Sequence, residues 1–263
     1  MSKKPKKKNR STPPVAGALR LPASDDIRIV LPDSPRFAGA SFGGADWLAW
    51  QLIDSAFPTG GFAHSSGLEA AWQHGEVRGR EELAAFAEAN LNQLGHAGLP
   101  FVLAAHGEPG DLPELDRLCD AFTLNHVANR ASRAQGRAFL TAVERIFKDE
   151  ISGVGLGSQP EVLPCSHFAP VFGACLRRLG LARETTGRMF FFNQLRSVLA
   201  AAVRLNIVGP MEAQVLTHRL SSKAESVLEA CESLTTEDIA QTAPLVDLWQ
   251  GAQDRLYSRL FQS

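Results

Sequence analysis

The chain has 263 residues and a mass of 28.4 kDa, and its 27 basic residues nearly balance its 28 acidic ones. Six of the basic residues lie in the first ten positions, which hold no acid, so the rest of the chain has 27 − 6 = 21 basic and 28 acidic residues. This acidic remainder argues against a nucleic-acid-binding surface, and the 44% hydrophobic content argues against a disordered chain. We therefore expect a globular protein that meets other proteins or cations.

Membrane insertion and secretion are not expected from the sequence. No uninterrupted apolar stretch approaches the ~18 residues that cross a bilayer, and the basic start is followed by Ser-Thr-Pro-Pro rather than by an apolar segment. The four cysteines are widely scattered, which is typical of free thiols in a reducing compartment: Cys119, Cys165, Cys175 and Cys231. We predict a cytoplasmic protein with no membrane partner.

Residues 1–44 are predicted to form a flexible, basic and proline-rich leader, because they hold six of the fifteen prolines and end in a Gly-Gly pair. A lysine cluster of this kind can bind nucleic acid or another anionic surface. A solvated tail that aids solubility is the favoured interpretation.

From residue 45 onward the apolar pattern is helical almost throughout, with no convincing strand alternation. Asp111 before Pro113 and the Gly209-Pro210 pair give start and stop signals. The sequence predicts an all-α fold, a single globular, helical-bundle-like domain of roughly ten helices over residues 45–263. The expected helices cover residues 46–56, 81–94, 111–124, 126–148, 167–179, 184–206, 210–220, 236–242 and 246–261.

Enzyme signatures are missing from the chain. The sequence contains no G-x-x-x-x-G-K-[ST], H-E-x-x-H or G-x-S-x-G motif, and no two of its seven histidines have i, i+4 spacing. The nearest metal-ligand pair is Cys165 with His167, whose sulfur and imidazole suit nickel, zinc or copper. A structural role for that pair is favoured. We predict no catalytic residue and no stably bound cofactor.

Residues 54–71 form the most distinctive segment. Pro58 is expected to end the preceding helix, and Gly60-Gly61 to permit the positive φ of a sharp turn. Ser66 and Glu69 have the S-x-x-E spacing of a capping box for the next helix. Phe57 and Phe62 are predicted to lie in the core.

The segment 54–71, D-S-A-F-P-T-G-G-F-A-H-S-S-G-L-E-A-A, resembles the N-terminal signature of the urease accessory protein UreF family. Four further blocks are similar to that family in the same order: 129–137 (N-R-A-S-R-A-Q-G-R), 167–173 (H-F-A-P-V-F-G), 195–214, and 256–263 (L-Y-S-R-L-F-Q-S). The resemblance covers everything except the leader.

The resemblance implies an all-helical, usually dimeric and cytoplasmic protein that is not an enzyme. Such a protein is a scaffold and chaperone for nickel insertion into apo-urease. It bridges the accessory protein UreD (UreH) and the GTPase UreG, and couples or modulates GTP hydrolysis. Nickel would then be in transit, and GTP would sit on the partner only.

Two other functions stay open. The chain could be a helical adaptor that binds an anionic partner through its basic leader, although its acidic body disfavours this. It could also be a metal-dependent hydrolase, which the missing ligand motifs disfavour further.

The predicted helix 126–148 has two distinct faces at ~100° per residue. Arg130, Arg133 and Arg137 share one face, which we assign to solvent or to an interface. Ser132 and Gln135 lie toward the apolar face, where Gln135 would need a buried hydrogen-bond partner. The small residues of that face, Gly136 among them, would allow a neighbouring helix to approach closely.

The predicted helix 184–206 carries a clear core stripe, which consists of Phe191, Leu195, Val198, Leu199 and Ala202. Nearly opposite this stripe lie Phe190, Ser197 and Arg204, a composition suited to a partner interface. An equally favoured interpretation is that Arg204 binds a neighbouring helix end or carboxylate within the fold.

Two segments complete the predicted interface. The turn within residues 54–71 forms a corner between two predicted helices. We expect this corner to lie near a partner or dimer contact through Asp54, Pro58, Thr59, Gly60, Gly61, His64 and Glu69. His64 is also a weak metal candidate, although a turn histidine with satisfied hydrogen bonds is favoured. The C-terminal tail, residues 255–263, either docks on its own domain or inserts into a partner. Docking on the UreD partner is favoured, through Arg255, Tyr257, Arg259, Leu260 and Phe261, so that removal of the tail would leave a folded chain without that partner.

Overall fold

The computed structural model describes residues 44–148 and 165–263. The predicted leader, apart from Gly44, and residues 149–164 lie outside the described residues. Within the described ranges the chain forms helices and turns and contains no β-strand, so the predicted all-α fold is confirmed. Every helix in these ranges is too short or too polar to cross a lipid bilayer.

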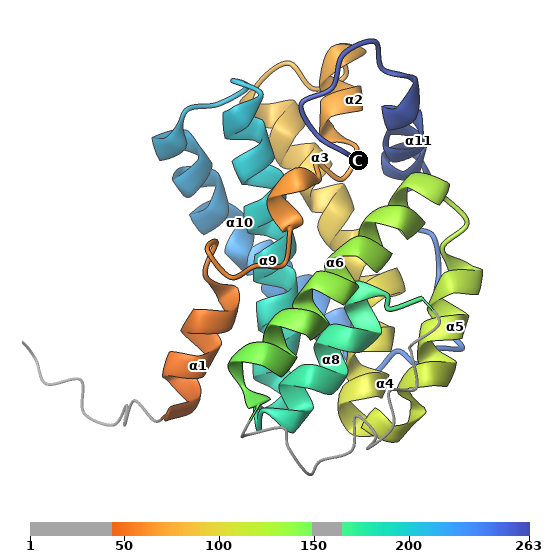
Figure 1. The fold of residues 1–263 in the computed structure, drawn as a ribbon. Coiled ribbons are helices and arrows are strands. Elements are labelled where there is room, and N and C mark those ends of the chain that lie inside the picture. The colour runs from red at the N-terminus through yellow and green to blue at the C-terminus, as the bar shows by residue number, and fades with distance from the viewer. Residues whose placement is uncertain (1–43, 149–164) are drawn as a thin grey trace, which may run out of the picture. The chain divides into compact units, whose positions relative to one another are not determined.

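The α-helices and the turns between them follow one another along the chain in the order that Figure 1 shows. A π-turn at Leu94–Gly98 joins the third helix to the fourth, and 3-10 turns occur at Gly61–Ala63, Pro109–Asp111 and Gln253–Arg255. The helices are α1 Gly44–Ile53, α2 Leu68–Gln73, α3 Arg80–Gln93, α4 Leu99–Gly107, α5 Leu112–Phe122, α6 His126–Ile146, α8 Phe168–Arg178, α9 Arg183–Arg204, α10 Pro210–Cys231 and α11 Pro244–Ala252.

Four sequence predictions of elements were wrong. Helix α10, predicted to end at residue 220, continues to Cys231. Helix α4 was missed, because its residues are apolar on all sides and show no helical stripe. No helix forms at 236–242, since Asp238 accepts hydrogen bonds from the backbone N–H and the hydroxyl of Thr235 and holds a turn instead. The last predicted helix, 246–261, ends at Ala252 and is followed by a 3-10 turn and an irregular tail.

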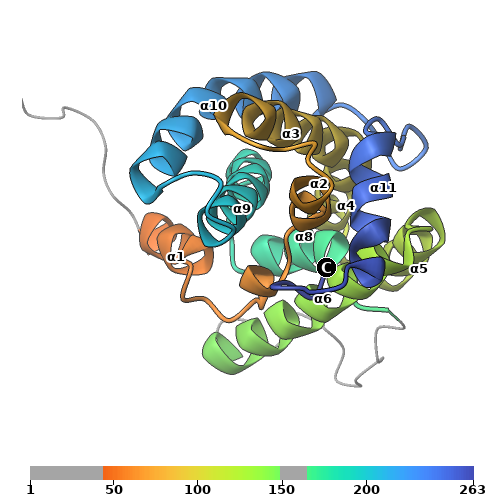
Figure 2. The ribbon, with the colours of Figure 1, turned by 90° about the horizontal axis from the view of Figure 1, so that it is seen from above.

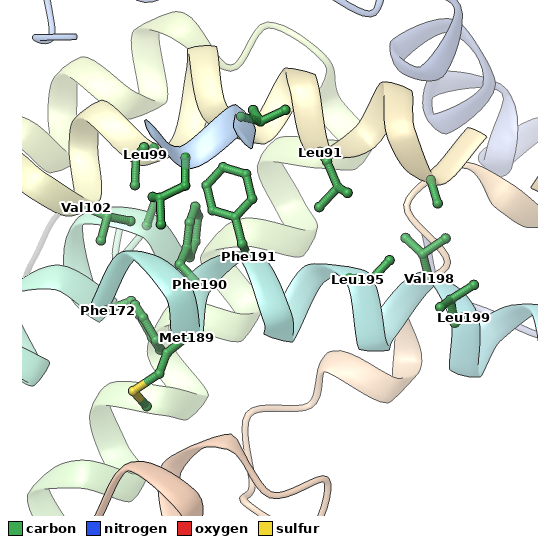
Figure 3. Close-up of a cluster of buried hydrophobic side chains, with 14 of the residues drawn as sticks. Leu91, Leu99, Val102, Phe172, Met189, Phe190, Phe191, Leu195, Val198 and Leu199 are labelled. Carbon is green, nitrogen blue, oxygen red and sulfur yellow. The ribbon is translucent and has the colours of Figure 1, made fainter. Parts of the chain in front are cut away.

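Helix α9 lies inside a ring formed by the other helices (Figure 2). Its predicted core stripe is confirmed, because all five of its members are buried. Figure 3 shows four of them, Phe191, Leu195, Val198 and Leu199, along one side of the helix. The apolar face of α9 thus provides much of the hydrophobic contact that holds the fold together.

Glycines allow two helix pairs to approach closely. A Cβ on Gly173 of α8 would lie 2.1 Å from the carbonyl oxygen of Val102 in α4. A Cβ on Gly136 of α6 would lie 1.9 Å from the carbonyl oxygen of Ser166, just before α8. The close approach expected at Gly136 is therefore present.

Replacing Gly136 by alanine is expected to lower the free energy of unfolding by about 1–3 kcal/mol, because backbone atoms would have to move to admit the methyl group. Urea unfolding measures this loss. Gly107→Ala is the matched control, since a Cβ there meets nothing within 4 Å. Equal stability of the two variants would contradict the packing described here.

Candidate functional site

The corner between α1 and α2 has the predicted turn but not the predicted cap. Gly60 has a φ of 70°, as expected for the reversal. The N-cap of α2 is Gly67, which has no side chain to cap the helix, and the backbone N–H of Glu69 donates to the hydroxyl of Ser65 at 3.4 Å rather than to Ser66. Ser66 instead accepts a hydrogen bond from Gln194 of α9 at 3.2 Å. The capping-box prediction was therefore wrong, and so was the core position of Phe62, whose ring is 76% exposed.

Glu69 joins the corner to the C-terminal tail. Its side chain is buried, and its carboxylate accepts hydrogen bonds from the backbone N–H groups of Leu260 at 2.6 Å and Phe261 at 3.1 Å. The amide of Gln253 donates a third bond at 2.6 Å. Glu69 thus serves the chain's own fold, which corrects its predicted position on a partner surface.

His64 and Ser65 extend this junction. The Nδ1 atom of His64 lies 2.5 Å from the hydroxyl oxygen of Ser263, and Ser65 donates to the Ser263 carbonyl oxygen from its hydroxyl and from its backbone N–H. Burial, with a smaller contribution from the charge of Arg130, lowers the pKa of His64 to about 4. The ring is therefore neutral near pH 7 and already has a hydrogen-bond partner, as the favoured interpretation expected.

The tail packs on its own domain, which is the alternative to the favoured prediction of partner docking. Phe261 is buried, and the guanidinium of Arg204 lies over its ring at 4.3 Å. Tyr257 is fully exposed and Leu260 is 52% exposed. The tail thus presents two apolar side chains outward, next to the exposed residues Arg255 and Arg259, and keeps one inside.

Phe190 is also inside the fold. Its ring packs against those of Phe168 and Phe172 and is only 4% exposed, so its predicted surface position was wrong. Figure 3 shows Phe190 among the buried side chains. Arg204 donates a hydrogen bond to the backbone carbonyl of Phe62. The alternative that this arginine is tied within the fold is therefore correct.

All five sequence blocks contribute to one cavity of about 640 Å³. Gln135 also faces this cavity, and its side chain makes no hydrogen bond to any described residue, so the predicted buried partner was not found. Residues distant in sequence thus surround one space. The wall includes Thr59, Gly61 and His64 from the corner, Ser132 and Gln135 from α6, Phe168 from α8, Ser197 and Arg204 from α9, and Phe261 from the tail.

The arginine face of α6 is partly occupied by the chain's own acids. Arg130 forms a two-pronged ion pair with Asp254 at 2.9 to 3.1 Å, and Arg259 of the tail reaches the same carboxylate at 3.0 Å. These cations lower the pKa of Asp254. Arg133 lies 3.8 Å from Asp120, and Arg137 is exposed.

Asp54, Pro58 and Thr59 form the outer part of the corner. Asp54 and Pro58 are exposed, and a hydrogen bond from the backbone N–H of Ala56 is the main cause that lowers the pKa of Asp54. Thr59 accepts a bond from the backbone N–H of Gly61 at 3.3 Å. These contacts shape the turn and leave its surface open.

The Cys165–His167 pair gains a third ligand-type group in the structure. One donor atom each from Asp120, Cys165 and His167 lie within 4.8 Å of one another, on the side where α5 meets α8. Sequence reasoning missed Asp120, because it lies 45 residues before the pair and no local spacing connects it to them.

Two tryptophans of α1 were also missed. Trp47 is 69% exposed and Trp50 is 49% exposed, and their rings form an edge-to-face pair with centroids 5.2 Å apart. Their i, i+3 spacing directly before the corner was the available signal for an aromatic surface.

The fold and the site define an all-α protein whose sequence motifs surround one cavity. Buried hydrogen bonds join its C-terminal tail to the corner between α1 and α2. The family model for UreF matches residues 77–221. The chain is 37% identical over 253 residues to urease accessory protein F of Oryza sativa subsp. indica (91% of this chain, 96% of that protein). It is 41% identical over 225 residues to urease accessory protein F of Arabidopsis thaliana (82% and 92%). It is 32% identical over 208 residues to urease accessory protein UreF of Mycobacterium tuberculosis (79% and 90%).

The chain belongs to the UreF family of urease accessory proteins.

Proposed function

We propose that this chain acts in urease maturation as a non-catalytic scaffold and chaperone for nickel insertion into apo-urease. In this role it bridges the accessory protein UreD (UreH) and the GTPase UreG, and modulates GTP hydrolysis by UreG. Family membership supports the link to urease, since the relatives are named as urease accessory proteins. The proposal includes a cytoplasmic homodimer that holds no cofactor of its own and binds neither nucleic acid nor membrane.

The observation that carries the proposal is the junction of corner and tail. Buried polar contacts fix its inner side, whereas large apolar side chains remain exposed on its outer side, including Phe62, Trp72, Tyr257 and Leu260. Exposed aromatic residues on a rigid base are typical of protein-binding surfaces. We assign this surface to the binding of UreD. GTP binding is assigned to UreG, because the sequence of this chain has no phosphate-binding loop motif.

Replacing both Tyr257 and Leu260 by alanine is expected to reduce co-purification of UreD at least tenfold, while the melting temperature stays unchanged, because both side chains point away from the core. Ile146→Ala is the matched control, since this side chain is 45% exposed at the end of α6. Pull-down of co-expressed UreD measures the effect. Undiminished binding by the double variant would contradict the assigned surface.

Co-expression of urease with its accessory proteins tests the function itself. Omitting this chain is expected to leave urease with little nickel and near-background activity. Metal analysis of purified urease provides the measurement. Full nickel loading in the absence of this chain would overturn the proposed function.

A further inference from the structure

We propose that Asp120, Cys165 and His167 form a binding site for one divalent transition-metal ion of borderline softness, with Ni²⁺ as the natural ion and Zn²⁺ as a competent substitute. The donor set of one thiol, one imidazole and one carboxylate suits such ions and disfavours Mg²⁺ or Ca²⁺, which prefer oxygen alone. The identification of Ni²⁺ as the natural ion rests on the proposed function. The site itself rests on its geometry.

The backbone that carries two of the donors is held in place without using them. Asp116 is fully buried and accepts hydrogen bonds from the backbone N–H groups of Cys165 at 2.9 Å, Ser166 at 2.8 Å and His167 at 2.7 Å. Ser166 has a φ of 61°, a left-handed conformation that costs energy for a serine. This turn brings the side chains on either side of Ser166 toward Asp120.

The imidazole of His167 has the second partner that metal-bound histidines require. Its Nε2 atom lies 3.0 Å from Asp120 Oδ1, and its Nδ1 atom lies 3.1 Å from the hydroxyl oxygen of Ser132. A serine hydroxyl can donate or accept. Without an ion, Nε2–H donates to Asp120 and the Ser132 hydroxyl donates to Nδ1. With an ion, the proton lies on Nδ1 and is donated to Ser132, so the Nε2 lone pair binds the ion and the ring need not turn.

The remaining adjustments are small. Metal bonds of about 2.0–2.3 Å would require the donor atoms to draw together by up to about 1 Å from their present separations. Asp120 can make most of this movement, because its side chain is 37% exposed whereas that of His167 is fully buried. The thiol proton of Cys165 leaves to solvent as the sulfur binds. Two anionic donors then balance the two positive charges of the ion.

Three protein donors leave a coordination position for water or for the next ligand. A structural zinc site is usually closed by four protein ligands, whereas this arrangement is open on the Asp120 side. An open site suits an ion that is passed on. Arg133 lies 3.8 Å from Asp120 on that side, where its positive charge would weaken the hold on a cation.

The experiment uses the purified full-length chain, titrated with Ni²⁺ alone and with Zn²⁺ alone. We expect one ion per chain, with a thiolate-to-nickel absorption band, and at least tenfold weaker binding in Cys165→Ser and in Asp120→Asn. The second variant keeps an oxygen acceptor for His167 and lies on a half-exposed side chain, so it remains informative if the first unfolds. Melting curves verify that each variant is folded.

The matched control is Cys231→Ser. Its sulfur lies 3.7 Å from Nδ1 of His96, which makes a second cysteine–histidine pair, but no acidic group joins that pair in the part of the chain that the structure describes. This variant is expected to bind the ion as the unchanged chain does. The site is overturned if the unchanged chain binds no ion, if Asp120→Asn binds as tightly as the unchanged chain, or if Cys231→Ser loses affinity equally.

Urease activation, measured beside ion binding, separates the two proposals. A chain that binds the ion but does not support urease activation overturns the proposed function and leaves the site standing. A chain that supports activation but binds no ion overturns the site alone.

Discussion

Replacing Glu69 by alanine is expected to lower the free energy of unfolding by about 3 kcal/mol and to detach the tail from the corner. The backbone N–H groups of Leu260 and Phe261 lose their only described acceptor, and the amide of Gln253 keeps only its 3.3 Å bond to the carbonyl oxygen of Phe261. Each unsatisfied buried donor costs about 1–3 kcal/mol, and movement of the tail into water recovers part of that cost. Urea unfolding measures the loss.

Hydrogen exchange provides the second measurement for Glu69→Ala. The amide of Phe261 is expected to exchange much faster in the variant, whereas amides in α9 keep most of their protection. Glu76→Ala is the matched control, because Glu76 is an exposed glutamate in the same region. Unchanged protection at Phe261 in Glu69→Ala would show that the carboxylate does not hold the tail.

This junction also changes the expected result of removing residues 255–263. From the sequence alone, that truncation would remove a docking segment and leave the domain intact. In the structure it also removes two of the three donors to Glu69, the acceptor of Ser65 and the Phe261 ring over which Arg204 lies. Loss of UreD binding by the truncated chain would therefore mix two causes, and the Tyr257 and Leu260 substitutions separate them.

Replacing Asp116 by alanine is expected to lower the free energy of unfolding by about 3–5 kcal/mol. This is the largest loss of stability expected for any substitution considered. The Asp116 carboxylate is completely buried and accepts three backbone hydrogen bonds, and charged acceptors make the stronger bonds. Without it, the turn before α8 has three unpaired N–H groups and a left-handed Ser166 with nothing to hold it. The donor set at Cys165 and His167 would lose its geometry as well.

Thermal and urea unfolding measure this effect, and Asp111→Ala is the control. Asp111 is an exposed aspartate at the start of the same helix, α5, and its side chain makes no cap hydrogen bond, contrary to the start signal inferred from sequence. A change within about 0.5 kcal/mol is expected there. Equal losses in the two variants would mean that the buried hydrogen bonds of Asp116 contribute nothing.

Local patterns predicted the parts of the fold that depend on local physics. The helical period identified the buried stripe of α9, and Gly60 was assigned positive φ because glycine adopts it most readily. Helix α4 shows the limit of the same signal. A segment that is apolar on every side carries no stripe, so periodicity could not distinguish it from a loop or a buried strand.

Contacts between distant residues could not be predicted, and they make up most of the candidate site. Glu69 lies three residues after Ser66, so a local capping box was a sufficient explanation of this glutamate. Its actual partners, Leu260 and Phe261, lie more than 190 positions later in the chain and could not be inferred from local spacing. Asp116 and Asp120 are ordinary acids of an amphipathic helix until the turn before α8 packs on them. Phe190 was predicted to lie on the surface because it lies opposite the apolar stripe of α9. The helical period alone cannot show that other helices also cover this second face.

The tail and corner meet only after almost the whole chain has been arranged. Their hydrogen bonds close a loop of 191 to 199 positions, so the entropy lost in closing it is repaid only once the helices between them have packed. We expect such a contact to form late in folding and to open before the α9 core does. The junction that faces the proposed partner is thus expected to open without unfolding of the α9 core.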